Sequence, residues 1–310
     1  FTYDRVFGPD ANQEDVYKVA CSKMLEDLFH GINCTVLAYG QTGSGKTHTM
    51  MGSKEKRGVI PRLVSSVFEH IDEHYGHSEA AEQKEHHVEV SVSYVEIYMD
   101  HVKDLLKPRN TNLRIRENHG HGIWVEGVCE ARVISQDDVM HVMDLGSRNR
   151  ATGRTNMNAH SSRSHSVFFL KLQQLHKDNT TARSSKLILV DLAGSERVEN
   201  SGATGQTLKE AQQINKSLSA LGNVIHSLTT KGSHHIPYRD SKLTWILSDS
   251  LGGNSRTTVI VTASPSAMNL EETICSLRFA TRAKMIKNKP QINESKSLGE
   301  YQRLLRKANK

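Results

Sequence analysis

Apolar residues recur along this chain in two alternating periods, which predict its helices and strands. Helical spacing predicts helices over residues 13–29, 61–71, 135–145, 207–228, 241–251 and 271–286. Short runs rich in β-branched residues predict strands over residues 34–39, 88–97, 166–175, 186–191 and 257–264. Helices that alternate with strands predict a layered α/β/α fold around a central mixed, mostly parallel sheet.

In the strand predicted over residues 88–97, the apolar residues shift from one face of the strand to the other. From Val88 to Tyr94 every second residue is apolar, as in a half-buried strand, but Val95 and Ile97 continue the apolar set on the other parity. One extra residue would restore the alternation. The pattern therefore predicts a β-bulge near Tyr94.

The length and the charge distribution limit the class of protein. A chain of 310 residues can bury a sizeable core, and one large domain is expected. The formal net charge is +6, but residues 278–310 alone hold ten Lys and Arg against two acidic residues, so the rest is nearly neutral. The overall charge therefore gives no support to nucleic-acid binding. The basic end either meets an acidic partner or is a solvated helix.

No pattern in the chain favours a membrane or an oxidising compartment. No apolar run reaches the length of a membrane span, no charged-then-apolar leader opens the sequence, and the four cysteines are scattered without metal-site spacing. A soluble protein in the reduced cytoplasm, without membrane insertion, is expected.

The residues after the first predicted strand match the phosphate-loop pattern G-x-x-x-x-G-K-[ST] in full, as Gly40-Gln41-Thr42-Gly43-Ser44-Gly45-Lys46-Thr47. The glycines allow several backbone N–H groups to converge on one anion, and the helix that follows presents its positive end to the same phosphates. In such a loop Lys46 reaches the β- and γ-phosphates, and Thr47 reaches Mg²⁺. The sequence therefore predicts a bound nucleoside triphosphate.

Three further stretches narrow the class of nucleotide-binding protein. Asn158-Ala-His-Ser161-Ser162-Arg163-Ser164-His165 surrounds one arginine with hydroxyl groups, which suits a loop that senses a γ-phosphate and its metal ion. Asp191-Leu-Ala-Gly194-Ser-Glu196 ends an apolar strand, where a metal-orienting aspartate belongs. The third stretch, Tyr238-Arg-Asp-Ser-Lys-Leu-Thr244, opens a helix. Taken singly, they also read as a solvated turn, a strand-end carboxylate and a capped helix start.

In this order, the four stretches resemble the phosphate loop, switch I, switch II and tubulin-facing segment of the kinesin motor domain. Residues 214–223 (INKSLSALGN) and 249–254 (DSLGGN) strengthen the resemblance, which extends from Phe1 to about Asn293. The pattern is most similar to the conventional branch, whose motor is N-terminal. It implies a Mg²⁺-dependent ATPase that binds ATP and ADP, is stimulated by microtubules and moves toward their plus ends.

The resemblance also implies roles in the nucleotide site. Thr47 and Ser162 would ligate Mg²⁺, and Asp191 would orient a metal-bound water. Arg163 and Glu196 would pair when the two switches close. Glu196 would then accept a proton, through a second water, from the water that attacks the γ-phosphate.

The attacking water and the γ-phosphate would be held by Ser161 and the backbone amide of Gly194. His48 would pack on the adenine ring, although a histidine at the start of a helix can also simply face water. The remaining residues that the resemblance places in the site are Asn158, Asn215 and the loop residues Gln41, Thr42, Gly43, Ser44 and Gly45.

The resemblance implies a contact with the microtubule, the track of the motor. This track contact is expected to be basic, because the tubulin surface is acidic. Its expected residues are Lys216, Lys231, Arg239 and Lys242. Trp245 stands where related motors usually carry an arginine. It is either part of this contact or a packed aromatic side chain without a role on the track.

The resemblance divides the chain into a motor domain (1–284), a neck linker (285–297) and the start of a neck helix (298–310). Closure of the switches would tilt the helix at 207–228 and open a slot in which Ile286 and Asn288 dock. Apolar residues in 298–310 give barely one heptad, so a homodimer through a coiled coil is plausible.

Related motors begin with a central strand that ends in Arg-x-Arg-Pro, and Phe1 follows the position of that strand. The sequence is therefore expected to be truncated, with only part of the base pocket present. Two alternatives keep the same fold: a microtubule-binding module without turnover, and a kinesin that depolymerises microtubule ends without processive transport. In every case the expected setting is the microtubule cytoskeleton of the cytoplasm.

Overall fold

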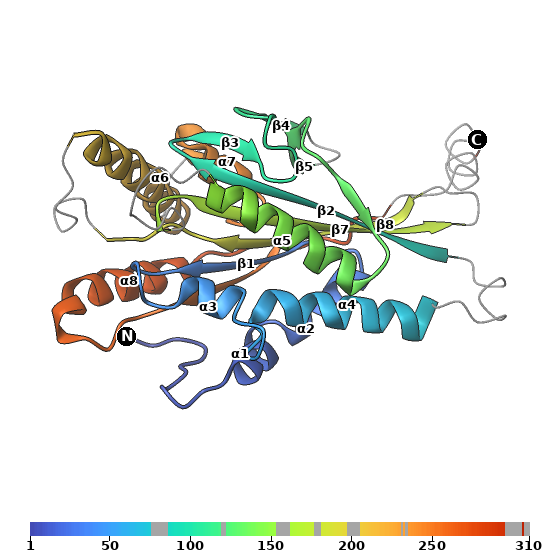
Figure 1. Cartoon of the computed structure of the whole chain (residues 1–310), viewed down its shortest axis with the longest axis horizontal. Coiled ribbons are helices and arrows are strands. Elements are labelled where there is room, and N and C mark those ends of the chain that lie inside the picture. The colour runs from blue at the N-terminus through green and yellow to red at the C-terminus, as the bar shows by residue number, and fades with distance from the viewer. Residues whose placement is uncertain are drawn as a thin grey trace.

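A seven-stranded mixed sheet forms the centre of the computed structural model (Figure 1). The structure describes residues 1–75, 86–118, 122–152, 162–176, 181–196, 205–230, 232, 235–294 and 306. Its strand order is β3-β2-β7-β8-β1-β9, and β6 pairs with β2 beside this path. The strands are β1 (Cys34–Tyr39), β2 (His86–Tyr98), β3 (His101–Asp104), β6 (Ala131–Val133), β7 (His165–His176), β8 (Thr181–Asp191) and β9 (Arg256–Val261). In the described chain, no strand pairs with the outer edge of β9.

The mixed α/β architecture is confirmed, but most neighbouring strands are antiparallel. β1 is parallel to β8 and β9, whereas β2 is antiparallel to β3, β6 and β7, and β7 is antiparallel to β8. Only four residues separate β7 from β8, and so short a connection joins antiparallel strands because a parallel pair needs a longer crossover. The prediction of a mostly parallel sheet is wrong for the described strands.

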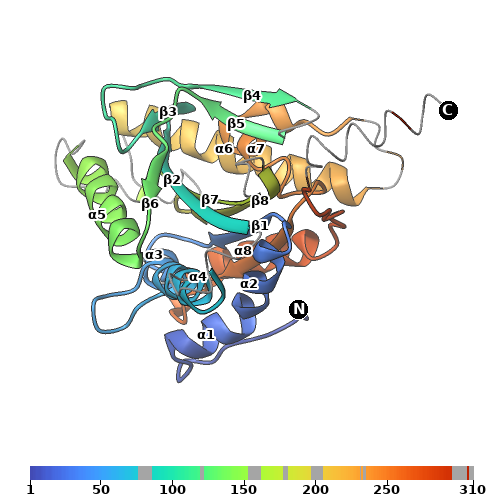
Figure 2. The same cartoon turned by 90° about the vertical axis from the view of Figure 1, so that its right-hand side faces the viewer.

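Helices cover both faces of the sheet (Figures 1 and 2). α1 (Gln13–Ala20), α2 (Ser22–Phe29), α3 (Lys46–Met50) and α4 (Val59–Tyr75) lie on one face, with α5 (Gln136–Thr152) beside them. α6 (Gly205–Thr229) and α7 (Lys242–Ile246) lie on the other, under a separate hairpin of β4 (Arg114–Asn118) and β5 (Gly122–Glu126). α8 (Leu270–Ala283) packs against β9 and α6. No helix in the described ranges is long and apolar enough to cross a membrane.

The sheet separates two hydrophobic cores, and this explains the change of parity in β2. Val92 and Tyr94 belong to one core, whereas Val95 and Ile97 belong to the other. The register of β2 against β7 is continuous, so the predicted bulge near Tyr94 is wrong. A strand that is buried on both faces carries apolar residues at both parities.

Several helix boundaries also differ from the prediction. The segment 13–29 is two helices, because Cys21 leaves the helical conformation at φ −134°, ψ −19°. α4 begins at Val59 rather than at Pro61. The helix predicted over 241–251 ends at Ile246, and the Ser-Asp-Ser sequence after it continues as turns, which short polar side chains favour.

Candidate functional site

The phosphate loop connects the carboxyl end of β1 to α3, beside the end of β8. Gly40, Gly43 and Gly45 have φ values of +152°, +78° and +101°, a region that favours glycine. A Cβ atom on Gly40 would overlap the backbone oxygen of Thr262. The loop therefore depends on glycine both for its conformation and for its close approach to the segment after β9.

Lys46 is buried in this loop, with 7% of its surface exposed. Its Nζ donates to the backbone oxygens of Gly40 (2.8 Å) and Gln41 (2.9 Å). Burial lowers the pKa of Lys46, while the charges of Asp191 and Glu196 oppose that shift. The ammonium group is thus held by neutral carbonyl groups, in a position where an anion in the loop would stabilise its charge.

Asp191 ends β8 opposite Ala38 of β1 and faces the start of α3. The hydroxyl of Thr47 donates to Oδ2 of Asp191 at 2.6 Å. The other oxygen, Oδ1, is buried and accepts no hydrogen bond from the described residues. Burial raises the pKa of Asp191, and the Thr47 hydrogen bond lowers it. The free Oδ1 next to a threonine hydroxyl suits a hydrated Mg²⁺ ion, which prefers oxygen ligands and retains several waters.

Glu196 ties the segment 191–196 to the phosphate loop. Its Oε2 accepts the backbone N–H of Thr42 at 2.8 Å, and its Oε1 accepts the Thr42 hydroxyl at 2.5 Å. The same segment donates from the Gly194 amide to the backbone oxygen of Ser162 (2.9 Å) and from the Ser195 amide to that of Gly40 (3.2 Å). Three motifs that are far apart in the sequence therefore meet at one site.

Gly194 leaves no room for a side chain. A Cβ atom at this position would overlap the Glu196 carboxylate and the Thr42 hydroxyl. Glycine is thus required for Glu196 to reach the loop.

His165 connects this segment to α6. The Ala193 N–H donates to Nδ1 of His165 (3.0 Å), so the ring proton lies on Nε2, which donates to the Ser217 hydroxyl (2.7 Å). Ser217 in turn donates to the backbone oxygen of Ile214 (2.6 Å). Burial lowers the pKa of His165 to about 3, so the ring is neutral. The sequence analysis did not identify this link, although a histidine at the start of an apolar strand and a serine within the apolar stripe of a helix are its signals.

Comparison with known proteins decides the family. The family model described as the kinesin motor domain matches residues 1–286. The chain belongs to the kinesin family.

Kinesins of known sequence are similar over nearly the whole chain. It is 51% identical to a kinesin heavy chain of Botryotinia fuckeliana over 312 residues, which covers 99% of this chain and 34% of that protein. It is 50% identical to kinesin-related protein 3 of Dictyostelium discoideum, covering 99% of this chain and 26% of the relative. The chain therefore spans about a third or less of the length of these relatives.

Solved kinesin structures have the same fold. A fast kinesin, described with implications for ATPase mechanism and microtubule interactions, aligns with a TM-score of 0.86 at 49% identity, over 97% of this chain and 84% of that one. A KIF14 dimer in the two-heads-bound state with AMP-PNP, in complex with a microtubule, aligns with a TM-score of 0.82 at 40% identity, over 95% and 82% of the two chains. The kinesin motor fold is confirmed.

The structure brings together the kinesin residues expected in the phosphate loop and in the segment 191–196, whereas Asn158, Ser161 and Lys231 lie outside the described residues. His48 is exposed, and its backbone oxygen accepts a hydrogen bond from Nε2 of Gln13 at 2.7 Å. Asn215 is half-buried on α6. The closed pairing of Arg163 with Glu196 stays a prediction.

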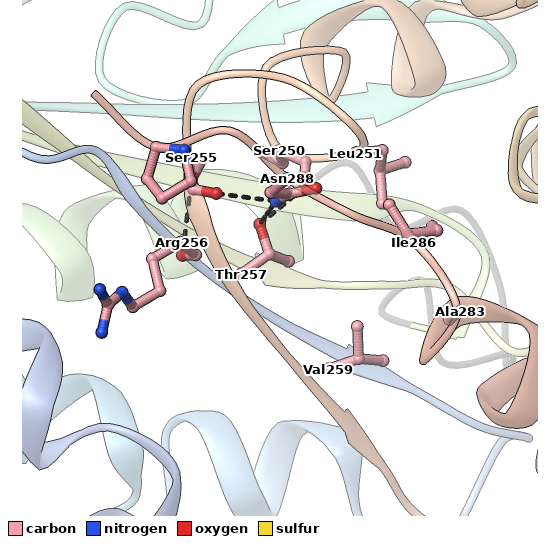
Figure 3. Close-up of a pocket in the computed structure, with 10 residues that line it drawn as sticks. Ser250, Leu251, Ser255, Arg256, Thr257, Val259, Ala283, Ile286 and Asn288 are labelled. Atoms are coloured by element: carbon pink, nitrogen blue, oxygen red, sulfur yellow. Dashed lines mark hydrogen bonds between the residues drawn. The ribbon is translucent and has the colours of Figure 1, made fainter. Parts of the chain in front are cut away.

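The expected neck linker of this kinesin lies against the loop before β9 and the start of that strand. Nδ2 of Asn288 donates to the backbone oxygens of Ser250 (2.9 Å) and Ser255 (2.7 Å) and to the Thr257 hydroxyl (3.0 Å), as Figure 3 shows. Its Oδ1 accepts the Gly252 N–H at 2.7 Å. The Asn288 amide is thus fully hydrogen-bonded.

A pocket of about 300 Å³ opens beside Asn288 (Figure 3). Its apolar lining includes Val259, Ala283 and Ile286. Ile286 also packs against the core on the α6 side of the sheet. Both residues expected to dock, Ile286 and Asn288, therefore contact the body of the domain.

A second attachment point, at Asn293, was not identified in the sequence. Its backbone N–H and its Nδ2 each donate to the Gly31 oxygen at 2.8 Å, and its Oδ1 accepts from Nδ2 of Asn254 at 2.9 Å. The Ser184 amide donates to the Asn293 oxygen at 3.0 Å. A single asparagine in a polar linker gives no signal, because its partners are remote in sequence.

Replacing Asn288 by alanine is expected to release the segment 286–294. The variant leaves the carbonyls of Ser250 and Ser255 and the Gly252 N–H without their side-chain partner, at a cost of about 2 kcal/mol or more. A loss of about 2 kcal/mol raises the population of the open segment about 30-fold, so amide hydrogen exchange there should become about 30-fold faster or more. Gln291→Ala is the matched control, since the Gln291 side chain is exposed. Equal exchange rates in the two variants would show that the Asn288 side chain does not hold the segment 286–294 in place.

Proposed function

We propose that this domain is an ATP-driven motor that moves along microtubules toward their plus ends. The observation that carries the proposal is the pair of hydrogen bonds from Thr42 of the phosphate loop to the carboxylate of Glu196. These bonds join the carboxylate of the second switch to the loop that would hold the phosphates of a nucleotide. A site with this arrangement can couple hydrolysis to movement of the switch.

The loop from Gln41 to Thr47 would hold the phosphates of ATP through its backbone amides and through Lys46. Thr47 and Ser162 would ligate Mg²⁺, and Asp191 would hold one of its waters through the free Oδ1. When bound, the ion would supply positive charge that offsets the negative charge of the phosphates. Phosphoryl transfer requires mainly positioning and charge stabilisation, and these side chains supply both.

Glu196 would accept a proton, through a second water, from the water that attacks the γ-phosphate. Ser161 and the Gly194 amide would position that water and the phosphate, and Arg163 would pair with Glu196 in the closed state. Asn158 and Asn215 would complete the site, and His48 would contact the adenine ring. The exposure of His48 leaves a face of its ring accessible to a base.

Motion would pass from the site to the neck through α6. His165 joins Ala193 to Ser217 on α6, and α6 packs against α8, which leads into the linker. The domain boundaries that fit this path are a motor at 1–284, a neck linker at 285–297 and the start of a neck helix at 298–310. A homodimer through that helix stays an expectation, because residues 295–305 lie outside the described part of the chain.

The track contact would use cations on the α6 and α7 side of the sheet. Lys216 and Arg239 are exposed there, and Lys242 is half-exposed. Lys231 belongs to the same expected contact. This assignment places the protein on the cytoplasmic microtubule cytoskeleton.

The main alternatives are a microtubule-binding protein without turnover and a depolymerising kinesin. The arrangement of Lys46, Asp191 and Glu196 supports turnover over the first. A linker bound at the carboxyl end of the motor supports transport over the second.

Two assays on one preparation test the proposal. Basal ATPase should rise on addition of microtubules, and surface-bound motor should move polarity-marked microtubules with their minus ends leading. Stimulated ATPase without movement would refute transport. Movement with plus ends leading would refute the direction, and a lack of stimulation would refute the assignment of the track.

A further inference from the structure

Two cations share the ring of Trp245. The Cζ of Arg239 lies 5.2 Å from the ring centroid, and the Nζ of Lys242 lies 5.5 Å from it. Both distances are within the roughly 6 Å over which the negative face of an aromatic ring attracts a cation. These are two of the cations proposed above for the track contact.

The local structure fixes this arrangement. Ser241 caps α7 through its hydroxyl, and Lys242 and Trp245 are three residues apart, so they share one face of the helix. Leu243 lies on the opposite side of α7 and is fully buried. Arg239 belongs to the 3-10 helix Tyr238–Asp240 directly before the cap, which brings its guanidinium to the same ring.

The ring itself is anchored. Trp245 packs against the core on the α6 side of the sheet, and its Nε1 is buried without a hydrogen-bond partner among the described residues. With no hydrogen bond from the indole among the described residues, the ring is held by its packing on the core and by the two cations at its face. Its orientation is therefore set by the core, and the cations adapt to it.

The charges around the ring are unbalanced. Arg239 forms one ion pair, with Glu117 of β4 at 3.1 Å, and both side chains are largely exposed. In the described chain, no carboxylate lies within ion-pair distance of Nζ of Lys242, although the Asp100 carboxylate accepts the backbone N–H of Lys242 at 2.7 Å. Two like charges beside one another repel, and the ring offsets that repulsion by attracting both.

We propose that Trp245 is a positioning residue for the microtubule contact: its ring holds Arg239 and Lys242 together as one preformed cationic site for an acidic side chain of tubulin. This inference rests on the proposed function. The ring orders the two cations before binding, which reduces the conformational entropy that they lose in the complex. The exposed Glu117 pair is weak, so the acidic side chain of tubulin displaces it at little cost.

Microtubule affinity of Trp245 variants, measured by co-sedimentation in ADP at low ionic strength, tests this role. Trp245→Leu keeps an apolar side chain on the core but removes the aromatic face, and it should weaken binding about fivefold. Trp245→Phe keeps an aromatic face and should therefore retain most of the affinity. If Trp245 acted only as an apolar side chain, leucine would replace it equally well. In an Arg239→Ala, Lys242→Ala background, Trp245→Leu should cost less than twofold.

Binding by Trp245→Leu that equals the unchanged protein would overturn the proposal, as would an equal loss in both backgrounds. A second measurement is independent of the track. The chain contains two tryptophans, so Trp124→Phe leaves Trp245 as the only tryptophan, which is excited selectively over the tyrosines at long wavelength. Its fluorescence should change when Arg239 and Lys242 are replaced by alanine, and an unchanged spectrum would refute the contact between ring and cations. A changed spectrum without microtubule binding by any form would refute the proposed function, and the track role with it.

Discussion

Glu196→Ala should bind ATP and hydrolyse it about 10²- to 10⁴-fold more slowly, the usual contribution of a positioned proton acceptor. The side chain lies at the mouth of the phosphate loop, where it accepts both the amide and the hydroxyl of Thr42. The amides and the lysine that would hold the phosphates belong to the loop itself, so nucleotide affinity should change little. Single-turnover hydrolysis and nucleotide binding, measured on the same sample, separate the two effects.

Glu196→Gln is the matched control for this variant. Glutamine keeps the length of the side chain and an oxygen that can accept from Thr42, but it cannot take up a proton. If Glu196 acts as the proton acceptor, both variants are slow. Recovery of turnover in the glutamine variant would show that the residue only holds the loop, and near-normal turnover of the alanine variant would contradict any role in hydrolysis.

Lys46→Ala should lower the affinity for ATP by about 10- to 100-fold, the value of one or two charge-assisted hydrogen bonds to phosphate. The ammonium of Lys46 donates hydrogen bonds to two backbone oxygens and is largely desolvated. Its removal should therefore leave the free energy of unfolding nearly unchanged, because the cost of burying its charge offsets the gain from its two hydrogen bonds. Titration with a fluorescent nucleotide and thermal unfolding measure the two quantities.

Lys23→Ala provides the control for Lys46→Ala, since Lys23 is exposed on α2 and far from the loop in sequence. It should change neither nucleotide affinity nor stability. A Lys46 variant that retains full affinity for ATP would show that the backbone amides alone hold the phosphates. A large loss of stability would show that the lysine serves chiefly to hold the loop.

The sequence predicted elements well where a short segment is buried along nearly its whole length. The strand predicted over 34–39 has the same bounds as β1. Its residues are almost all buried, so they form a nearly continuous apolar run of strand length. The prediction failed where a pattern has two physical explanations. The parity change at Tyr94 and Val95 fits either a bulge or burial on both faces, and only the second core distinguishes them.

The motifs of the site were visible because each is local, but their contacts were not. Thr42 and Glu196 are 154 residues apart, and nothing in either motif specifies that they bond. Asn293 is 262 residues from Gly31, and its role depends on where the linker lies. Motifs in the sequence therefore identify candidate site residues, and the fold determines which of those residues contact one another.

His165 makes the connection between the nucleotide site and α6 insensitive to acidity. Its pKa of about 3 means that the ring does not gain a proton at any pH found in cytosol, so the Ala193 and Ser217 hydrogen bonds keep their direction. A second proton on Nδ1 would face the donor of Ala193 and break the connection. Burial of this one imidazole thus keeps both of its hydrogen bonds independent of pH around neutrality.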